Sequence, residues 1–249
     1  MGSRKKNEID GFRGKMAGMM KDEGKLISYL QNTSHQMRTP LTLIRSYTEL
    51  ILAELYGPLN SEISDKMETI SMNLEEMTYF VDQVQDMGFI SSEDSGVELK
   101  ESDISLLVDK IASDMFQIGK PRKVTFSLEN MEGSHLLVLD QHLTRRALSH
   151  ILRYVVSTAP YGHDIKVALK PGKERTLVII FGFGQVLDPD QMTAIVRSMS
   201  ETESKLTTME WEKLSLPITK ALMEMQGGDL TVLEDDTDKT VYVLEFPNR

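Results

Sequence analysis

The sequence predicts two structural parts: an all-α helical hairpin, which would pair with a second copy into a dimeric four-helix bundle, and then an α/β sandwich. Two observations carry this prediction. Before residue 88 the apolar residues recur at alternating spacings of three and four, which is the pattern of supercoiled helices. After residue 98 helical and strand-like patterns alternate, as expected where helices cover one face of a mixed sheet.

The helical part contains two apolar stripes with a turn between them. The turn is the segment YGPLN, Tyr56 to Asn60, which carries glycine, proline and asparagine. A lone hairpin cannot bury both stripes, so pairing with a second copy is expected. The stripe residues are Ile27, Leu30, Ser34, Met37, Leu41, Ile44, Thr48 and Ile51 in the first helix, and Ile63, Met67, Ile70, Leu74, Met77, Val81 and Val84 in the second.

A polar segment that contains glycine and serine, GFISSEDSGVE (Gly88 to Glu98), is typical of a linker. It sets the expected domain boundaries: an N-terminal linker over residues 1–20, the helical domain over residues 21–90 and the α/β domain over residues 91–249.

In the second part a helix is expected over residues 104–118, followed by the strand-like runs KVTFSLE and HLLVLD. Asp140 is a candidate N-cap for the next helix. The runs IKVALK and TLVIIF, separated by a Pro-Gly turn, predict a β-hairpin. A further helix is expected to end at Gly227 and Gly228, before the strands LTVLE and TVYVLEF.

Composition restricts the functional classes. Of the 249 residues, 40% are hydrophobic and 27% are charged, which is ordinary for a globular protein. The net charge of −10 disfavours binding to nucleic acid or to an anionic membrane, so neither partner is expected. The absence of cysteine excludes disulfides, thiolate metal ligands and thiol catalysis. No apolar run is long enough to cross a bilayer, and we expect a cytoplasmic chain, or the cytoplasmic part of a longer sensor.

The segment SHQMRTPLT, Ser34 to Thr42, places a histidine, an arginine and a proline within the first predicted helix. It resembles the phosphoacceptor box of sensor histidine kinases, S-H-E-x-R-T-P-L-T, and the resemblance extends from Lys21 to Phe246. The resemblance implies a dimerisation and histidine-phosphotransfer domain followed by an α/β domain of the histidine-kinase ATPase type. It also implies that His35 accepts a phosphoryl group.

The residue types suit that chemistry. Near neutral pH, imidazole can be a nucleophile toward phosphorus and then a leaving group. His35 follows the stripe residue Ser34, so it is expected on the bundle surface, where a donor can approach in line. Arg38 can neutralise phosphoryl oxygens, and Thr39 lies one turn from His35 on the same face. By the resemblance, the Thr39 hydroxyl positions the water that hydrolyses a partner's aspartyl phosphate. Pro40 removes a backbone hydrogen bond and can bend the helix beside His35.

Gln36 departs from the box, which has an acidic residue at this position. A carboxylate can accept the second imidazole proton, whereas an amide can orient the ring but cannot take a proton. Loss of a general base costs about 10²–10⁴-fold in rate. The departure weakens attack on ATP more than attack on an aspartyl phosphate, which is already a reactive acyl phosphate.

The nucleotide-binding boxes of that family are replaced in the second part. The asparagine box becomes LSHILRYVVSTAP, the D-x-G-x-G box becomes GFGQVL, and the final glycine box becomes KLSLPI. The replaced positions are His150 and Tyr154 for the two asparagines, Gly182 for the aspartate, and Val186, Lys213 and Ser215 for glycines.

These replacements remove the usual ligands for Mg²⁺ and adenine. Losing the adenine-binding aspartate alone predicts about ten- to hundredfold weaker binding of ATP. We therefore expect this chain to hold no cofactor and no metal ion, with Mg²⁺ supplied by the receiver domain. The alternative is a divergent pocket that binds ATP through other groups, for example Lys213 or Arg153.

The preferred interpretation is a two-component signalling protein that does not use ATP. In this interpretation His35 exchanges phosphoryl groups with the aspartate of a response-regulator receiver domain, as a phosphotransferase or phosphatase, and the chain is a homodimer. Two alternatives stay open. One is an ATP-dependent histidine autokinase with a divergent nucleotide site. The other is a non-enzymatic pseudokinase scaffold that binds a partner histidine kinase or a response regulator.

Overall fold

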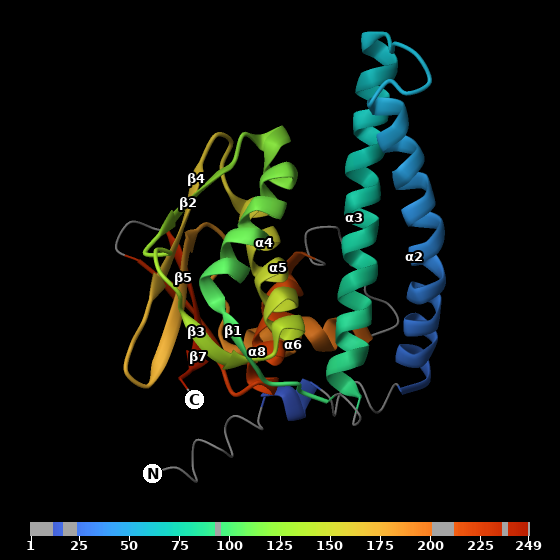
Figure 1. Cartoon of the computed structure of the whole chain (residues 1–249). Coiled ribbons are helices and arrows are strands. Elements are labelled where there is room, and N and C mark those ends of the chain that lie inside the picture. Colours follow the sequence, from blue (N-terminus) through green and yellow to red (C-terminus); the bar gives the residue numbers. More distant parts are fainter. Residues whose placement is uncertain (1–11, 17–23, 93–95, 201–211, 236–238, 249) are drawn as a thin grey trace. The chain divides into compact units, whose positions relative to one another are not determined.

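The computed structural model describes residues 12–16, 24–92, 96–200, 212–235 and 239–248 (Figure 1). The chain forms two compact units. One comprises the helical hairpin, with residues 20–92, and the other comprises residues 93–249 together with the N-terminal residues. In the segment expected to be an N-terminal linker, residues 12–16 are helical.

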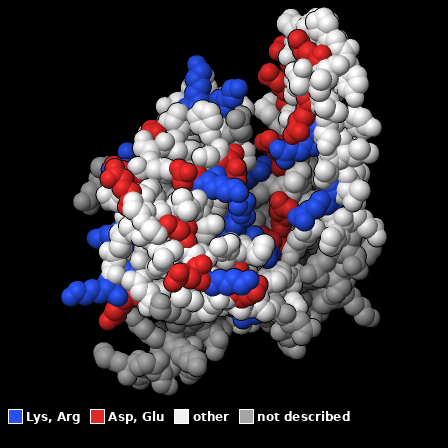
Figure 2. Space-filling model, viewed as in Figure 1, with Lys and Arg blue, Asp and Glu red and all other residues white. Residues whose placement is uncertain are grey.

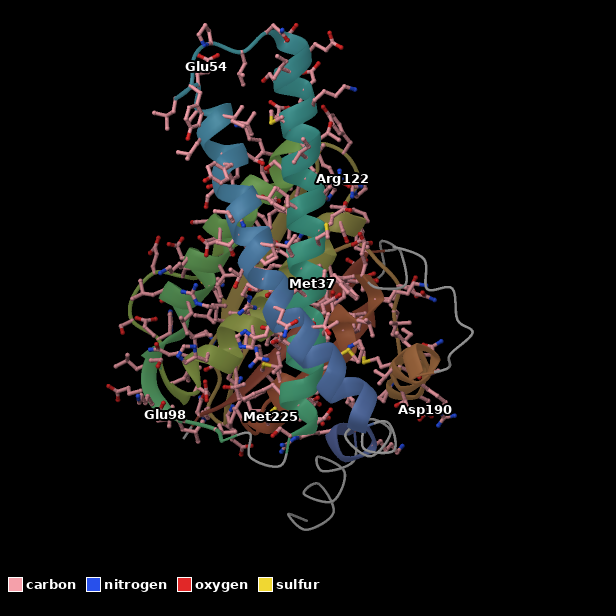
Figure 3. All side chains as sticks on the ribbon, turned by 90° about the vertical axis from the view of Figure 1, so that its right-hand side faces the viewer. Met37, Glu54, Glu98, Arg122, Asp190 and Met225 are labelled. Atoms are coloured by element: carbon pink, nitrogen blue, oxygen red, sulfur yellow. The ribbon has the colours of Figure 1, made fainter. Side chains whose placement is uncertain are left out.

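The hairpin consists of α2 (Gly24–Leu52) and α3 (Ser61–Ser91), as the apolar spacing predicts. The predicted turn at residues 56–60 lies between them, and Asn60 caps α3 because its side-chain oxygen accepts a hydrogen bond from the backbone N–H of Ile63, at 2.8 Å. Met37 of α2 packs against a core cluster formed by Leu41, Leu74 and Val81 (Figure 3).

The predicted linker begins too early. Residues 88–91 are the last residues of α3, and the backbone N–H of Ser92 bonds to the carbonyls of Gly88 and Phe89 at its end. Phe89 and Ile90 continue the helix after Gly88, and one glycine within a helix costs only about 1 kcal/mol. The polar composition of the segment therefore placed the start of the linker about one helical turn too early.

The two apolar stripes divide into two seven-residue registers. Ser34, Leu41 and Thr48 on α2, spaced seven apart, are buried, as are Leu74 and Val81 on α3. In the intervening register, Ile44, Ile63, Ile70 and Met77 are between 39% and 47% exposed. Two other members are covered, since Met37 packs against the core cluster and Val84 is buried. Each helix thus leaves part of its stripe on the surface.

The second unit is an α/β sandwich, and this confirms the predicted fold class. Its five-stranded sheet has the order β2-β4-β5-β7-β6, with one parallel pair, β2 and β4, and antiparallel pairs elsewhere. Helices α4 and α5 lie on one face of this sheet (Figure 1). The strands are β2 (Thr125–Glu129), β4 (Asp164–Lys170), β5 (Arg175–Gly182), β6 (Asp229–Glu234) and β7 (Thr240–Pro247). The helices are α4 (Ile104–Gly119), α5 (Gln141–Thr158), α6 (Pro189–Ser200) and α8 (Ser215–Met225).

A separate two-stranded sheet was not predicted. It joins β1 (Lys100–Asp103) to β3 (Leu136–Leu139) in antiparallel register. The sequence of β1, KESD, has no apolar alternation, so only its hydrogen bonds to β3 reveal it as a strand.

Local signals set the ends of two helices in the second unit. Asp140 caps α5, as predicted, because its carboxylate accepts hydrogen bonds from the backbone N–H groups of His142 and Leu143. Pro217 lies in the first turn of α8, where a missing N–H removes no helical bond. Gly227 ends this helix with a φ of +79°, a conformation that suits glycine. Among the described residues, no helix is long and apolar enough to span a membrane.

Candidate functional site

The predicted site residues on α2 lie together on the surface of the hairpin. His35, Gln36, Arg38 and Thr39 are all exposed, while the preceding Ser34 is buried. Within the described part of the chain, His35 and Thr39 make no side-chain hydrogen bond or ion pair. The imidazole is therefore open to solvent and to an approaching donor, as the position after a stripe residue predicts.

Arg38 is paired with a residue that sequence reasoning missed. Its Nη2 atom lies 2.5 Å from Oδ1 of Asp82 on α3, and the two side chains are 46% and 42% exposed. The backbone of Arg38 is also held, since the Thr42 hydroxyl donates to its carbonyl oxygen at 2.8 Å. The cation predicted to meet phosphoryl oxygens is thus fixed one turn from His35.

Pro40 lies inside α2 and leaves a gap in the backbone ladder. The residue has no N–H, so the carbonyl of Gln36 receives no helical hydrogen bond from it. Both residues are exposed, which means that water can reach the unused carbonyl. The defect lies immediately beside the imidazole, in the same helical turn.

In the second unit two of the three replaced nucleotide boxes, those that contain Tyr154 and Gly182, meet at the segment Phe183–Gln185, which follows β5. The Tyr154 hydroxyl accepts a hydrogen bond from the backbone N–H of Gln185 at 3.2 Å. The Tyr242 hydroxyl donates to the carbonyl of Phe183 at 2.8 Å. The Tyr154 and Tyr242 rings form an edge-to-face pair with centroids 6.1 Å apart. We call these residues, with Thr158 and Thr240, the tyrosine cluster.

The two threonines complete the contacts to the same segment. Thr158 Oγ1 donates to the carbonyl of Phe183 at 2.7 Å, and Thr240 Oγ1 donates to the carbonyl of Gly184 at 2.8 Å. Burial raises the pKa of the Tyr154 hydroxyl and of the Tyr242 hydroxyl, so both remain neutral hydrogen-bonding groups. The tyrosine cluster therefore fastens the segment to α5 and β7 through uncharged contacts.

The glycines at this segment fit the cluster and leave no room for larger residues. Gly184 has a φ of +135°, and a Cβ atom there would lie 2.5 Å from the Tyr242 hydroxyl and 2.9 Å from Cε1 of Tyr154. A Cβ at Gly182 would collide with the side chain of Val155. The position at which the related boxes carry an aspartate thus has no space for one without a shift of α5.

The remaining replaced positions differ in burial. His150 on α5 and Ser215 on α8 are buried, Lys213 is half-buried, and Val186 is 37% exposed. Among the described residues, no group of three or more histidine, aspartate or glutamate side chains could hold a metal ion. Of the predicted positions, the structure brings Tyr154 into contact with the segment after Gly182. Tyr242 on β7 completes the cluster. The alternating pattern of this strand did not predict that role.

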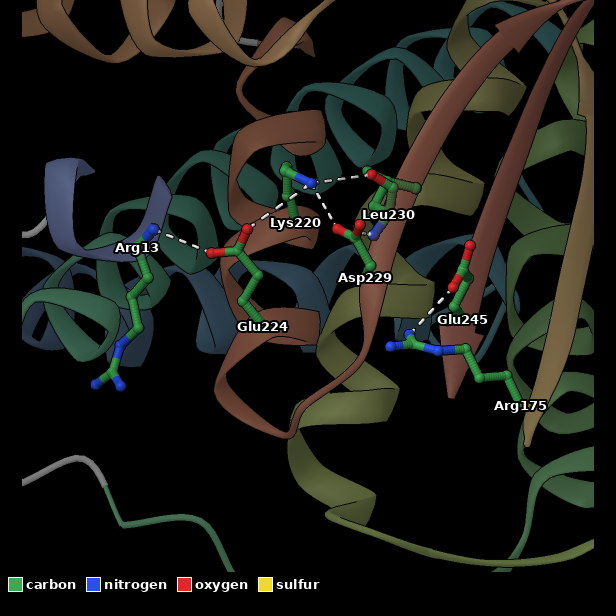
Figure 4. Close-up of polar contacts among 7 residues, drawn as sticks. All are labelled: Arg13, Arg175, Lys220, Glu224, Asp229, Leu230 and Glu245. Atoms are coloured by element: carbon green, nitrogen blue, oxygen red, sulfur yellow. Dashed lines mark hydrogen bonds and ion pairs between the residues drawn. The ribbon is translucent and has the colours of Figure 1, made fainter. Parts of the chain in front are cut away.

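A partly buried ionic cluster lies where α8 meets β6 (Figure 4). Lys220 Nζ lies 2.5 Å from Asp229 Oδ1 and 3.7 Å from Glu224 Oε1, and it donates to the carbonyl of Leu230. The other Glu224 oxygen accepts a hydrogen bond from the backbone N–H of Arg13, at 3.0 Å. Burial raises the pKa of Glu224 to about 7, although Lys220 opposes the shift.

Surface charges of the two signs are interspersed on the face shown in Figure 2. Two ion pairs link neighbouring strands of the sheet. Lys166 on β4 lies 2.6 Å from Glu129 on β2, and Arg175 on β5 lies 3.0 Å from Glu245 on β7.

The chain is similar to known signalling proteins in both units. The model of the His Kinase A (phospho-acceptor) domain matches residues 26–93. The sensor histidine kinase CusS of Escherichia coli (strain K12) is 24% identical over 88% of this chain, and the chain spans 45% of that protein. The sensor histidine kinase YcbM of Bacillus subtilis (strain 168) is 23% identical over 92% of the chain, which spans 73% of it.

Solved structures share the fold. The full-length ShkA structure in complex with AMPPNP matches 89% of this chain and 46% of its own length, with a TM-score of 0.59 and 17% identity. The Acinetobacter baumannii histidine kinase AdeS matches 86% of this chain and 97% of its own length, with a TM-score of 0.53 and 12% identity. These likenesses agree with the predicted order of a helical hairpin followed by a mixed α/β domain.

Proposed function

Because the chain belongs to the sensor histidine kinase family, we propose that His35 is its phosphoryl acceptor and that it exchanges this group with a response-regulator aspartate without using ATP. The chain spans about half the length of the CusS protein it matches, so this proposal concerns the activity of the two units present. The chain works as a homodimer and its second unit serves as a docking surface for the receiver domain.

The observation that carries the ATP-independent part is the tyrosine cluster. We infer that a nucleotide held as in the related boxes would displace the segment after β5 and so break its hydrogen bonds with Tyr154, Tyr242, Thr158 and Thr240. At about 1 kcal/mol each, these bonds oppose binding by about 4 kcal/mol, or roughly a factor of 10³ in affinity. The residues present do not fit ATP and Mg²⁺, and no step of the reaction below uses them.

The phosphotransfer step begins on the receiver. A ring nitrogen of His35 forms a bond to phosphorus as the acyl phosphate bond breaks, and the receiver's carboxylate leaves with the electron pair. The imidazole releases its other proton to water, since the Gln36 amide can orient the ring but cannot accept the proton. The guanidinium of Arg38 neutralises charge on the phosphoryl oxygens. In the hydrolytic direction, the Thr39 hydroxyl orients the attacking water.

An ATP-dependent autokinase is the second candidate, favoured by the names of the relatives, which are sensor histidine kinases. The two functions differ in the donor of the phosphoryl group. An autokinase labels His35 from ATP, whereas the proposed phosphotransferase labels it only from a phosphorylated receiver.

The test incubates the full chain and its His35→Ala variant with radiolabelled ATP and Mg²⁺, and separately with receiver domains phosphorylated by labelled acetyl phosphate. We expect label on the wild-type chain only in the second arm, and no label on His35→Ala. Label from ATP alone would establish the autokinase. No label in either arm, with partner binding unchanged in His35→Ala, would establish a non-enzymatic scaffold.

A further inference from the structure

The ion pair between Arg38 and Asp82 joins the two helices of the hairpin beside the candidate phosphoryl acceptor. Asp82 lies on α3, forty-four residues along the chain from Arg38, and no motif in the sequence connects the two. The inference that follows rests on the proposed function, because it concerns how the same site handles a phosphoryl group.

Packing of the hairpin core brings the two side chains together. Met37 packs against a cluster that contains Val81, and Arg38 and Asp82 are the next residues on their respective helices. Each charged side chain therefore emerges at the rim of the same apolar contact. The rigid core fixes the separation of the two backbones, and the hydrogen bond from Thr42 to the Arg38 carbonyl fixes the arginine's own turn.

The pair contributes little to folding, because both of its members are nearly half exposed and screened by water. Its main consequence is orientation. A free arginine side chain samples many rotamers, but one bond to Asp82 restricts the position of the guanidinium. The pair uses one Nη atom, so the other N–H groups of the planar guanidinium remain available as donors.

We propose that Asp82 is a positioning residue that holds the Arg38 guanidinium beside His35, so that its remaining N–H groups receive the oxygens of the incoming phosphoryl group. Asp82 itself does not touch the phosphoryl group. It acts through Arg38, by reducing the orientational freedom that is otherwise lost when the transition state forms. The Asp82 carboxylate compensates the positive charge of the guanidinium. The arginine is therefore ordered without attracting other anions strongly.

The test uses the full chain and potassium phosphoramidate, a small phosphoryl donor that needs no receiver domain. The His35 nitrogen forms a bond to phosphorus, the phosphorus–nitrogen bond of the donor breaks, and ammonia leaves with the proton of the imidazole. Phosphohistidine is followed by intact mass spectrometry as a function of time and of donor concentration, and His35→Ala identifies the label that belongs to this site.

The variants are Asp82→Asn, Asp82→Glu, Arg38→Ala and the double variant of Arg38→Ala with Asp82→Asn. We expect Arg38→Ala to slow the labelling of His35 by about tenfold or more, since it removes charged hydrogen bonds to phosphoryl oxygens. Asp82→Asn is expected to slow it by about three- to tenfold, and Asp82→Glu to restore most of the rate. In the Arg38→Ala background, Asp82→Asn should change nothing, because it has no arginine left to position.

The chain offers a matched control in the exposed ion pair between Arg45 and Glu49, at 2.8 Å on the same helix. Glu49→Gln removes a comparable charge away from His35 and should leave the labelling rate unchanged. Urea unfolding of each variant establishes that the hairpin remains folded.

The outcomes separate this inference from the proposed function. If wild type is labelled at His35 but Asp82→Asn reacts as fast or faster, Asp82 does not position Arg38 and the inference is overturned while the function stands. The same holds if Asp82→Asn slows the reaction equally with and without Arg38. If His35 of the wild type takes no label at all, both the inference and the proposed acceptor role fail.

Discussion

Glu224 is a buried carboxyl group whose ionisation falls within the physiological pH range. Burial raises its pKa to about 7 from an ordinary value of 4.5, and Lys220 only partly offsets this effect. Lys220 is shared, because it lies closer to Asp229 than to Glu224. The backbone N–H of Arg13 faces the other oxygen of Glu224.

This pKa predicts how the second unit responds to pH. The folded state holds a proton on Glu224 up to a higher pH than the unfolded state does, so the free energy of unfolding falls as pH rises from about 4.5 to 7. Glu224→Gln stays neutral and removes this contribution. Compared with wild type, the variant should gain stability between pH 5 and pH 8, measured by urea unfolding. An equal pH dependence in both proteins would contradict the assignment.

The sequence predicts the exposure of His35 but not the roles of Asp82 and Tyr242. The box around His35 predicted that residue's exposure because helical spacing alone decides it. Asp82 and Tyr242 were not predicted, because their roles depend on which elements pack together. Nothing near either residue in the sequence distinguishes Asp82 from other acidic residues of α3 or Tyr242 from an ordinary core tyrosine.

At the scale of elements, α2 carries a proline where a regular helix would not. Pro40 leaves the Gln36 carbonyl without its helical partner, and its ring crowds the preceding turn. The helix nevertheless continues to Leu52, because its apolar face packs against α3. Tertiary packing here outweighs local propensity.

Pro40→Ala should therefore stabilise the hairpin. The restored hydrogen bond and the relieved clash contribute about 3 kcal/mol, and the greater freedom of the unfolded chain removes about 1 kcal/mol of that gain. We expect about 2 kcal/mol of added stability in urea unfolding followed by circular dichroism. Pro58→Ala, in the exposed turn between the helices, is the control and should lose stability slightly. A Pro40→Ala variant less stable than wild type would mean that α2 is adapted to its proline.

Most elements follow from local patterns. The helices α4, α5 and α8 and the β4–β5 hairpin lie where periodicity, the Asp140 cap and the Gly227 C-terminus predict them. The strand β1 and the end of α3 were missed for the same reason. The strand β1 depends on its hydrogen bonds to β3, and the end of α3 depends on continued packing of the helix. Local composition does not encode these contacts.

At the scale of the whole molecule, part of the second apolar register of the hairpin stays exposed among the residues that the structure describes. Ile44, Ile63, Ile70 and Met77 recur at the spacing of a helical seam, between 39% and 47% exposed. A two-fold symmetric dimer would bury this register in a four-helix bundle, while the buried register of Leu41 and Leu74 serves each hairpin internally. The four exposed side chains of this register thus favour a homodimer over a monomer.

The register predicts which substitutions separate the dimer. Ile44→Glu places a charge in the seam twice, once in each copy, and removes two buried isoleucines that contribute about 1.5–3 kcal/mol each. The Kd of the dimer should rise by about 10²–10⁴-fold, measured by sedimentation equilibrium over a range of concentrations. Leu55→Glu is the matched control, since Leu55 is 66% exposed and lies beyond α2, outside the seam.

The bundle would be excluded if the wild type sedimented as a monomer throughout, or if Leu55→Glu dissociated the dimer and Ile44→Glu did not. Circular dichroism would show that both variants keep the helical hairpin, so that a change in mass reports association alone.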